Sequence, residues 1–229
     1  VETMKNTVLH FQVDQQEINV IINHCYVIGY AGRDMEKNMA HIIELEKIGV
    51  PRPTEIPTLY PVRRSSLNQS GQIEVLGNKS SGEVEVVIIF GDQEDDVYIT
   101  VGSDHTDRSL ETVDIGKSKQ VCDKPLAQTA WKLSDVIDHW DELVLVSEVK
   151  VDGEWIAYQK DNLSSIIPYS EIIGFLDKKG LTKRNSAVFS GTVPLLTDFK
   201  YGTGFKMMIV DEVRNRRIEA EYEIVLLDK

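Results

Sequence analysis

Cysteine is scarce in this sequence, and its two cysteines, Cys25 and Cys122, do not form a CxxC pair. They cannot build a disulfide framework, and no histidine lies beside Cys122 to favour a zinc site. We therefore expect two reduced thiols in a cytoplasmic protein. A chain of 229 residues is long enough to bury a stable core without cross-links.

Positive charge and long apolar runs are also scarce. Asp and Glu number 37 against 25 Lys and Arg, which gives a net charge of −12. This acidic surplus argues against nucleic acid and anionic membranes as partners, because both are bound by clustered cations. The longest apolar runs have the length of a strand, and the first residues lack the basic start and apolar stretch of a signal peptide. We expect a soluble, globular chain.

The sequence instead carries many strand-like segments and few helical ones. Apolar spacing predicts a helix from Met35 that is capped by Asp34 and ends at Gly49. A second helix, within residues 164–180, is predicted to end at Gly180. The prolines of residues 50–61 predict an extended connector without regular structure. Strands are predicted in segments 8–13, 18–31, 71–77, 82–91, 95–104, 141–153, 154–161, 186–194 and 204–227.

This order of elements predicts a mixed, β-rich α+β fold with largely antiparallel strands. We expect one domain over residues 1–229. Residues 1–60 would form an N-terminal subregion of strands and one helix, and residues 61–229 a β-rich metal-binding core. Hairpin turns are expected at Asp152-Gly153 and around Asn215.

An acidic pair inside a predicted strand is the strongest indication of chemistry. Because side chains alternate along a strand, Glu83 and Glu85 of GEVEVVIIF share one face. The strand continues into apolar residues, and carboxylates at the edge of a core need a cation. Asp104, at the end of the next predicted strand, would complete a site of three hard oxygen ligands, which suit Mg²⁺ or Mn²⁺. The alternative is an exposed acidic face with Asp104 in a turn.

These motifs follow the order found in the fumarylacetoacetate hydrolase superfamily, which the sequence resembles from about Gly29 to Pro194. In particular, it resembles a bacterial branch of that superfamily whose function is unknown. The resemblance implies a β-roll or sandwich with a few surrounding helices, Mg²⁺ or Mn²⁺ as cofactor, and a homodimer. The matching elements are Glu83 and Glu85, Asp104 with Thr106 and Arg108, Lys117-Ser118 before VCDKPL, Gln159 in VDGEWIAYQKDN, and Thr192 in FSGTVP.

The resemblance also implies a function, namely a metal-dependent hydrolase or lyase that acts on a 2-oxo acid or 1,3-dicarbonyl compound. Hydrolysis of a C–C bond in an acylpyruvate-like substrate is the main hypothesis. An oxaloacetate-type decarboxylase remains an alternative, as does a non-catalytic protein of the same fold that binds a metal or a small acid.

Roles for further residues follow from the same resemblance. His41 and Glu44, three residues apart on the predicted helix, would activate water, although such a pair is also typical of a helix surface. Lys117 would stabilise the negative charge that develops on the substrate. A small-molecule carboxylate substrate would be bound by Arg33, Arg108, Gln159 and Thr192.

Overall fold

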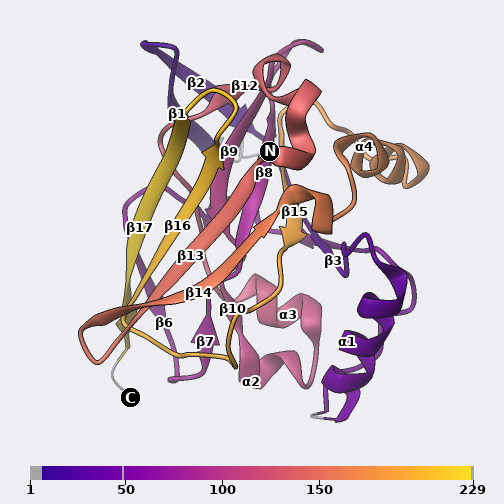
Figure 1. Ribbon diagram of the computed structural model, residues 1–229, viewed down its shortest axis with the longest axis vertical. Coiled ribbons are helices and arrows are strands. Elements are labelled where there is room, and N and C mark those ends of the chain that lie inside the picture. The colour runs from indigo at the N-terminus through magenta and orange to yellow at the C-terminus, as the bar shows by residue number, and fades with distance from the viewer. Residues whose placement is uncertain (1–6, 48, 228–229) are drawn as a thin grey trace, which may run out of the picture.

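The computed structural model describes residues 7–47 and 49–227, without the side chains of His41 and Glu44. Within this part of the chain, a six-stranded and a five-stranded sheet form the body of the molecule (Figure 1). In spatial order, the six-stranded sheet consists of β12 (Trp131–Lys132), β9 (Val97–Ser103), β8 (Val84–Phe90), β15 (Ser186–Thr192), β3 (His24–Gly29) and β4 (Thr58–Val62). The five-stranded sheet consists of β14 (Glu154–Asn162), β13 (Val144–Val151), β16 (Gly204–Asp211), β17 (Arg216–Leu226) and β6 (Gln72–Val75).

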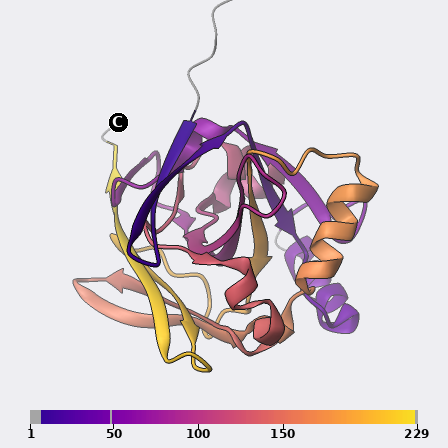
Figure 2. The same ribbon diagram turned by 90° about the horizontal axis from the view of Figure 1, so that it is seen from above.

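Shorter elements surround these sheets. Three strand pairs are β1 (Thr7–Val13) with β2 (Gln16–Ile22), β5 (Leu67–Asn68) with β11 (Lys124–Pro125), and β7 (Ser80–Ser81) with β10 (Thr106–Asp107). The α-helices are α1 (Met35–Lys47), α2 (Arg108–Glu111), α3 (Ile115–Gln120) and α4 (Tyr169–Lys178). Single 3₁₀ segments are η1 (Arg64–Ser66), η2 (Leu133–Asp135), η3 (Ile137–Glu142) and η4 (Leu163–Ser165). Figure 2 shows α1 and α4 on the same side of the molecule. No helix in residues 7–47 and 49–227 is long and apolar enough to cross a membrane.

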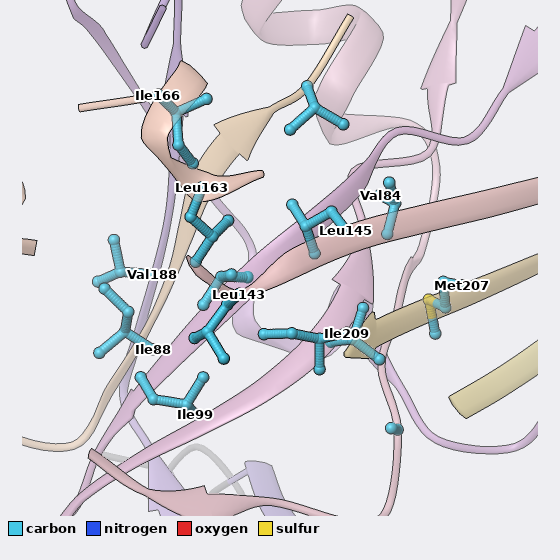
Figure 3. Close-up of a cluster of buried hydrophobic side chains, with 14 of the residues drawn as sticks. Val84, Ile88, Ile99, Leu143, Leu145, Leu163, Ile166, Val188, Met207 and Ile209 are labelled. Carbon is cyan, nitrogen blue, oxygen red and sulfur yellow. The ribbon is translucent and has the colours of Figure 1, made fainter. Parts of the chain in front are cut away.

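The main core lies between the two large sheets, where β13 and β16 pack against β8 and β9. Figure 3 shows part of this core, including Val84 and Ile88 of β8 and Ile209 of β16. A second core lies under the β1–β2 hairpin and includes Val87 and Ile89 of β8. Strand β8 therefore faces an apolar core on both sides, and all seven of its residues are buried.

The structure confirms the β-rich α+β fold and several local predictions. The carboxylate of Asp34 caps α1 by accepting backbone N–H groups of Glu36 at 3.0 Å and Lys37 at 3.2 Å. The turn at Asp152-Gly153 has two consecutive residues with positive φ, which matches the right-handed twist of the hairpin strands. Asn215 also has positive φ, in the β16–β17 turn.

Two predictions about elements were wrong. The predicted strand 18–31 is divided at Asn23 into β2 and β3, which belong to different sheets. The predicted connector 50–61 contains most of β4, which accommodates Pro61 because it is an edge strand and needs hydrogen-bond donors on one side only. The predicted strand 186–194 is confirmed as β15, which carries a bulge between Phe189 and Thr192.

Candidate metal and active site

The three predicted carboxylates meet because of the β8–β9 register. Val84 of β8 pairs with Ser103 of β9, so Glu83 and Asp104 lie opposite each other just beyond the pair. The Asp104 N–H donates to the Glu83 carbonyl at 3.0 Å. Glu85 follows Glu83 by two residues, so the two side chains lie on the same side of the strand. Oxygen atoms of the three side chains lie within 4.8 Å of one another.

This cluster is not an exposed acidic face. Glu85 is 1% exposed and Asp104 is fully buried. The Oδ1 atom of Asp104 lies 3.3 Å from the Lys124 ammonium but has no hydrogen-bond partner in the described part of the chain. Three converging carboxylates, one of them with an oxygen free of hydrogen bonds, fit a hard divalent cation such as Mg²⁺ or Mn²⁺.

The two glutamates differ in their pKa. Burial acts to raise the pKa of Glu83, but the charges of Arg108 and Lys119 outweigh it and lower the pKa to about 2. Burial raises the pKa of Glu85 well above its ordinary value, and the charges of Asp104 and Glu83 raise it further. A bound divalent cation would relieve this repulsion among the carboxylates.

The bulge in β15 holds Glu85 in place. The Gly191 N–H donates to Oε2 of Glu85 at 2.9 Å. Gly191 has a φ of +89°, and a Cβ at this position would lie 2.5 Å from the Cβ of Ala31. Only glycine adopts this backbone and fits this space, so the FSGTVP segment supplies a backbone donor to the cluster.

Arg108 lies at the cluster, as the sequence predicted, but its guanidinium is engaged by protein groups. Its Nε donates to Ser81 at 2.7 Å, its Nη1 donates to Glu111 at 3.1 Å, and its Nη2 lies 3.0 Å from Oε1 of Glu83. The Phe199 ring covers it, with its centroid 4.6 Å from the Arg108 Cζ. In this arrangement Arg108 holds Glu83 rather than offering a free fork to a substrate.

The lysine that reaches the carboxylates is Lys119, not Lys117. The Lys119 ammonium contacts Oδ2 of Asp104 and lies 3.5 Å from Oε2 of Glu83. The Lys117 side chain is 75% exposed, and its ammonium lies 3.5 Å from Asp114. Successive residues of a helix differ by about 100° in direction, so positions 117 and 119 of α3 face nearly opposite sides. Lys119, and not Lys117, therefore points toward the carboxylate cluster.

Gln159 and Thr192 support the site through a shared network. The Gln159 amide oxygen accepts from the Val84 N–H at 3.0 Å and from Ser147 at 3.0 Å. Its amide nitrogen donates to Thr192 Oγ1 at 2.8 Å and to the Val193 carbonyl at 2.7 Å. Thr192 Oγ1 in turn donates to the Val84 carbonyl at 2.7 Å. Both predicted substrate ligands thus anchor Val84, the first residue of β8, which lies between Glu83 and Glu85.

The remaining predicted residues lie on or near α1. Arg33 forms a two-pronged ion pair with Asp141 at 2.8 and 2.7 Å and donates from Nε to the Ile166 carbonyl, so its guanidinium is engaged away from the carboxylate cluster. His41 and Glu44 belong to α1, but their side chains lie outside the described part of the structure, and their role stays a prediction.

Sequence reasoning missed Glu111, Lys119 and Lys124. Glu111 follows Arg108 by three residues, which is the spacing of an ion pair on one helical turn and could have been recognised. Recognising Lys119 would have required the boundaries of α3, because they determine which of its side chains point toward the carboxylates. Lys124 stands before a proline in VCDKPL, and no local pattern marks it as a buried residue.

Solved structures share this architecture. A fumarylpyruvate hydrolase from Pseudomonas aeruginosa in complex with Mn²⁺ and pyruvate aligns over 99% of this chain and 100% of its own, with a TM-score of 0.66 and 16% identity. A 2-keto-3-deoxy-D-arabinonate dehydratase complexed with magnesium and 2,5-dioxopentanoate aligns over 96% and 79%, with a TM-score of 0.65 and 14% identity. A putative fumarylacetoacetate hydrolase family protein from Yersinia pestis CO92 aligns over 96% and 100%, with a TM-score of 0.67 and 14% identity.

The chain therefore has the fold of the fumarylacetoacetate hydrolase superfamily. Its sequence belongs to the family described as protein of unknown function (DUF2848), whose model matches residues 28–222. No curated protein sequence matches the chain. The fold and the uncharacterised branch agree with the resemblance seen in the sequence.

Proposed function

We propose that this protein is a Mg²⁺- or Mn²⁺-dependent enzyme that cleaves a C–C bond in a 2-oxo acid or 1,3-dicarbonyl compound, such as an acylpyruvate. The observation that carries the proposal is the convergence of Glu83, Glu85 and Asp104 beside the Lys119 ammonium. Two proteins of the same fold support it, because one was solved with Mn²⁺ and pyruvate and another with magnesium and a dioxo acid.

The three carboxylates would hold the cation, which would polarise the substrate carbonyl as a Lewis acid. The Lys119 ammonium lies among them and is positioned to stabilise negative charge on a substrate oxygen as the C–C bond breaks. Arg108 holds Glu83, and Gln159 holds the strand between Glu83 and Glu85. The proposed His41–Glu44 pair on α1 would take a proton from the attacking water.

Metal binding is tested first, by thermal unfolding of wild type and Asp104→Asn in EDTA, Mg²⁺ and Mn²⁺. A ligand at 100 times its dissociation constant adds about 2.7 kcal/mol to the stability. At this chain length that corresponds to a rise of roughly 5–10 °C in Tm. We expect the rise in wild type and none in the variant. Equal rises in both would place the cation elsewhere and refute the site.

The reaction is tested by incubating the Mg²⁺- and Mn²⁺-loaded protein with acylpyruvates, oxaloacetate and 2-oxo-3-deoxy sugar acids, with product analysis by NMR. Hydrolysis yields two carboxylic acids, decarboxylation releases CO₂, and dehydration retains the carbon skeleton. We expect hydrolysis, and we expect His41→Ala to abolish it without weakening metal binding. Decarboxylation that persists in His41→Ala would instead support the oxaloacetate-type alternative, since that reaction needs no activated water. Binding of these acids without turnover of any would support the non-catalytic alternative.

A further inference from the structure

Lys124 is a fully buried lysine that the proposed mechanism does not use. Its ammonium donates to the carbonyls of His105 at 2.7 Å and Cys122 at 3.2 Å, and it also contacts the carbonyl of Lys119. The Oδ1 atom of Asp104 lies 3.3 Å away. Removing an ammonium from water is costly, so a lysine in this position needs all of these partners.

These partners come from two separate segments of the chain. His105 directly follows Asp104 at the end of β9, whereas Lys119 and Cys122 lie at the end of α3 and just beyond it. Figure 1 shows α3 beside the lower ends of the strands. The Lys124 side chain therefore links the segment that carries a carboxylate of the cluster to the segment that carries its lysine.

We propose that Lys124 is a positioning residue that fixes Asp104 and Lys119 relative to each other and thereby sets the affinity for the divalent cation. The inference rests on the metal site of the proposed function. It makes a directional claim, because Lys124 has two opposing effects. Its positive charge repels the divalent cation, so on charge alone the loss of Lys124 would tighten metal binding. Its hydrogen bonds hold the cluster in register, so on geometry its loss would weaken binding.

The test is a Mn²⁺ titration of Lys124→Met, with free Mn²⁺ measured by electron paramagnetic resonance. Methionine retains most of the side-chain length and removes the donors and the charge. Loss of a group that orients a metal ligand typically costs about 10–100-fold in affinity, and we expect a loss of that size. Lys206→Met is the matched control. The Lys206 ammonium lies 3.5 Å from Glu148 outside the cluster, and its loss should change the affinity by no more than about twofold.

Unchanged or tighter Mn²⁺ binding by a folded Lys124→Met protein would overturn the proposal, even if the wild-type site is real. If the wild type itself binds no Mn²⁺, both the metal site and the role of Lys124 are refuted. The wild-type titration therefore distinguishes failure of the proposed function from failure of the proposal for Lys124.

If Lys124→Met does not fold, wild-type protein with ¹⁵N-labelled lysine decides the question. A buried ammonium with three carbonyl acceptors should give a slowly exchanging signal in NMR spectra. Mg²⁺ should shift this signal together with that of Lys119 and leave the exposed Lys117 unchanged. A Lys124 signal whose chemical shift does not change in saturating Mg²⁺ would overturn the proposal.

Discussion

Gln159 is the residue whose replacement tests most directly how the two sheets build the site. Its side chain is fully buried and forms four hydrogen bonds, to Val84, Ser147, Thr192 and Val193. Gln159→Met keeps the approximate size and removes all four bonds. The two hydroxyl partners can rotate toward other groups, and Thr192 keeps its bond to the Val84 carbonyl.

The two backbone partners cannot adjust in this way. The Val84 N–H and the Val193 carbonyl would be left unpaired inside the protein, at about 1–3 kcal/mol each. We therefore expect Gln159→Met to lower the free energy of unfolding by about 2–6 kcal/mol. At about 2–4 °C per kcal/mol for a chain of this length, the Tm should fall by roughly 5–20 °C.

The assay is urea unfolding in EDTA, followed by tryptophan fluorescence, so that metal binding does not contribute. Gln72→Met is the control, because the exposed Gln72 amide makes one side-chain hydrogen bond, to Glu223 at 3.0 Å. It should change the stability by no more than about 0.5 kcal/mol. A loss of less than 1 kcal/mol in Gln159→Met at an unchanged m-value would refute the reasoning. It would mean that β8 keeps its hydrogen bonds without this amide.

Four further predictions follow. Lys119→Met should lower kcat about 10²–10³-fold in steady-state assays, whereas Lys117→Met should leave it within about twofold; equal losses would return the role to Lys117. Gly191→Ala should lower the stability by about 1–3 kcal/mol in urea unfolding, because φ is positive and the added Cβ meets Ala31; an unchanged stability would show that the bulge relaxes. Burial acts to raise the pKa of Asp211, but the hydrogen bond from Arg216 lowers it below its ordinary value. The contribution of ionised Asp211 to the free energy of unfolding should therefore be complete above about pH 4 and decline as pH falls through the folded pKa. The stability gap between wild type and Asp211→Asn should accordingly narrow below pH 4, and a constant gap would contradict this. Pyruvate should bind in Mg²⁺ and not in EDTA by calorimetry, and equal binding in both would show that the cation does not recruit the acid.

The carboxylate cluster could be predicted because it depends on local rules. Alternation puts Glu83 and Glu85 on one side of a strand, and a short connection to the next strand brings Asp104 back beside them. The Asp34 cap and the Asp152-Gly153 turn are likewise properties of a few consecutive residues.

The supporting groups could not be predicted, because their partners are distant in sequence. Gln159 matched the superfamily pattern, but nothing near it in the chain indicates that its amide is occupied by Val84, 75 residues away. The same holds for Arg33, whose partner Asp141 lies 108 residues away. Choosing between Lys117 and Lys119 required the direction of each side chain on α3, which changes with a shift of one residue in the helix.

The charge of the described cluster suggests an order of binding. Glu83, Glu85, Asp104 and Glu111 face three cationic side chains, those of Arg108, Lys119 and Lys124. With all four carboxyl groups ionised, these four negative charges exceed the three positive charges by one when no metal is bound. A bound divalent cation changes this to an excess of about one positive charge, which would attract the proposed anionic 2-oxo acid. The arginines expected to grip the substrate carboxylate are engaged by Asp141, Glu83 and Glu111. Attraction of the acid then depends on the cation and Lys119, so the metal should bind first.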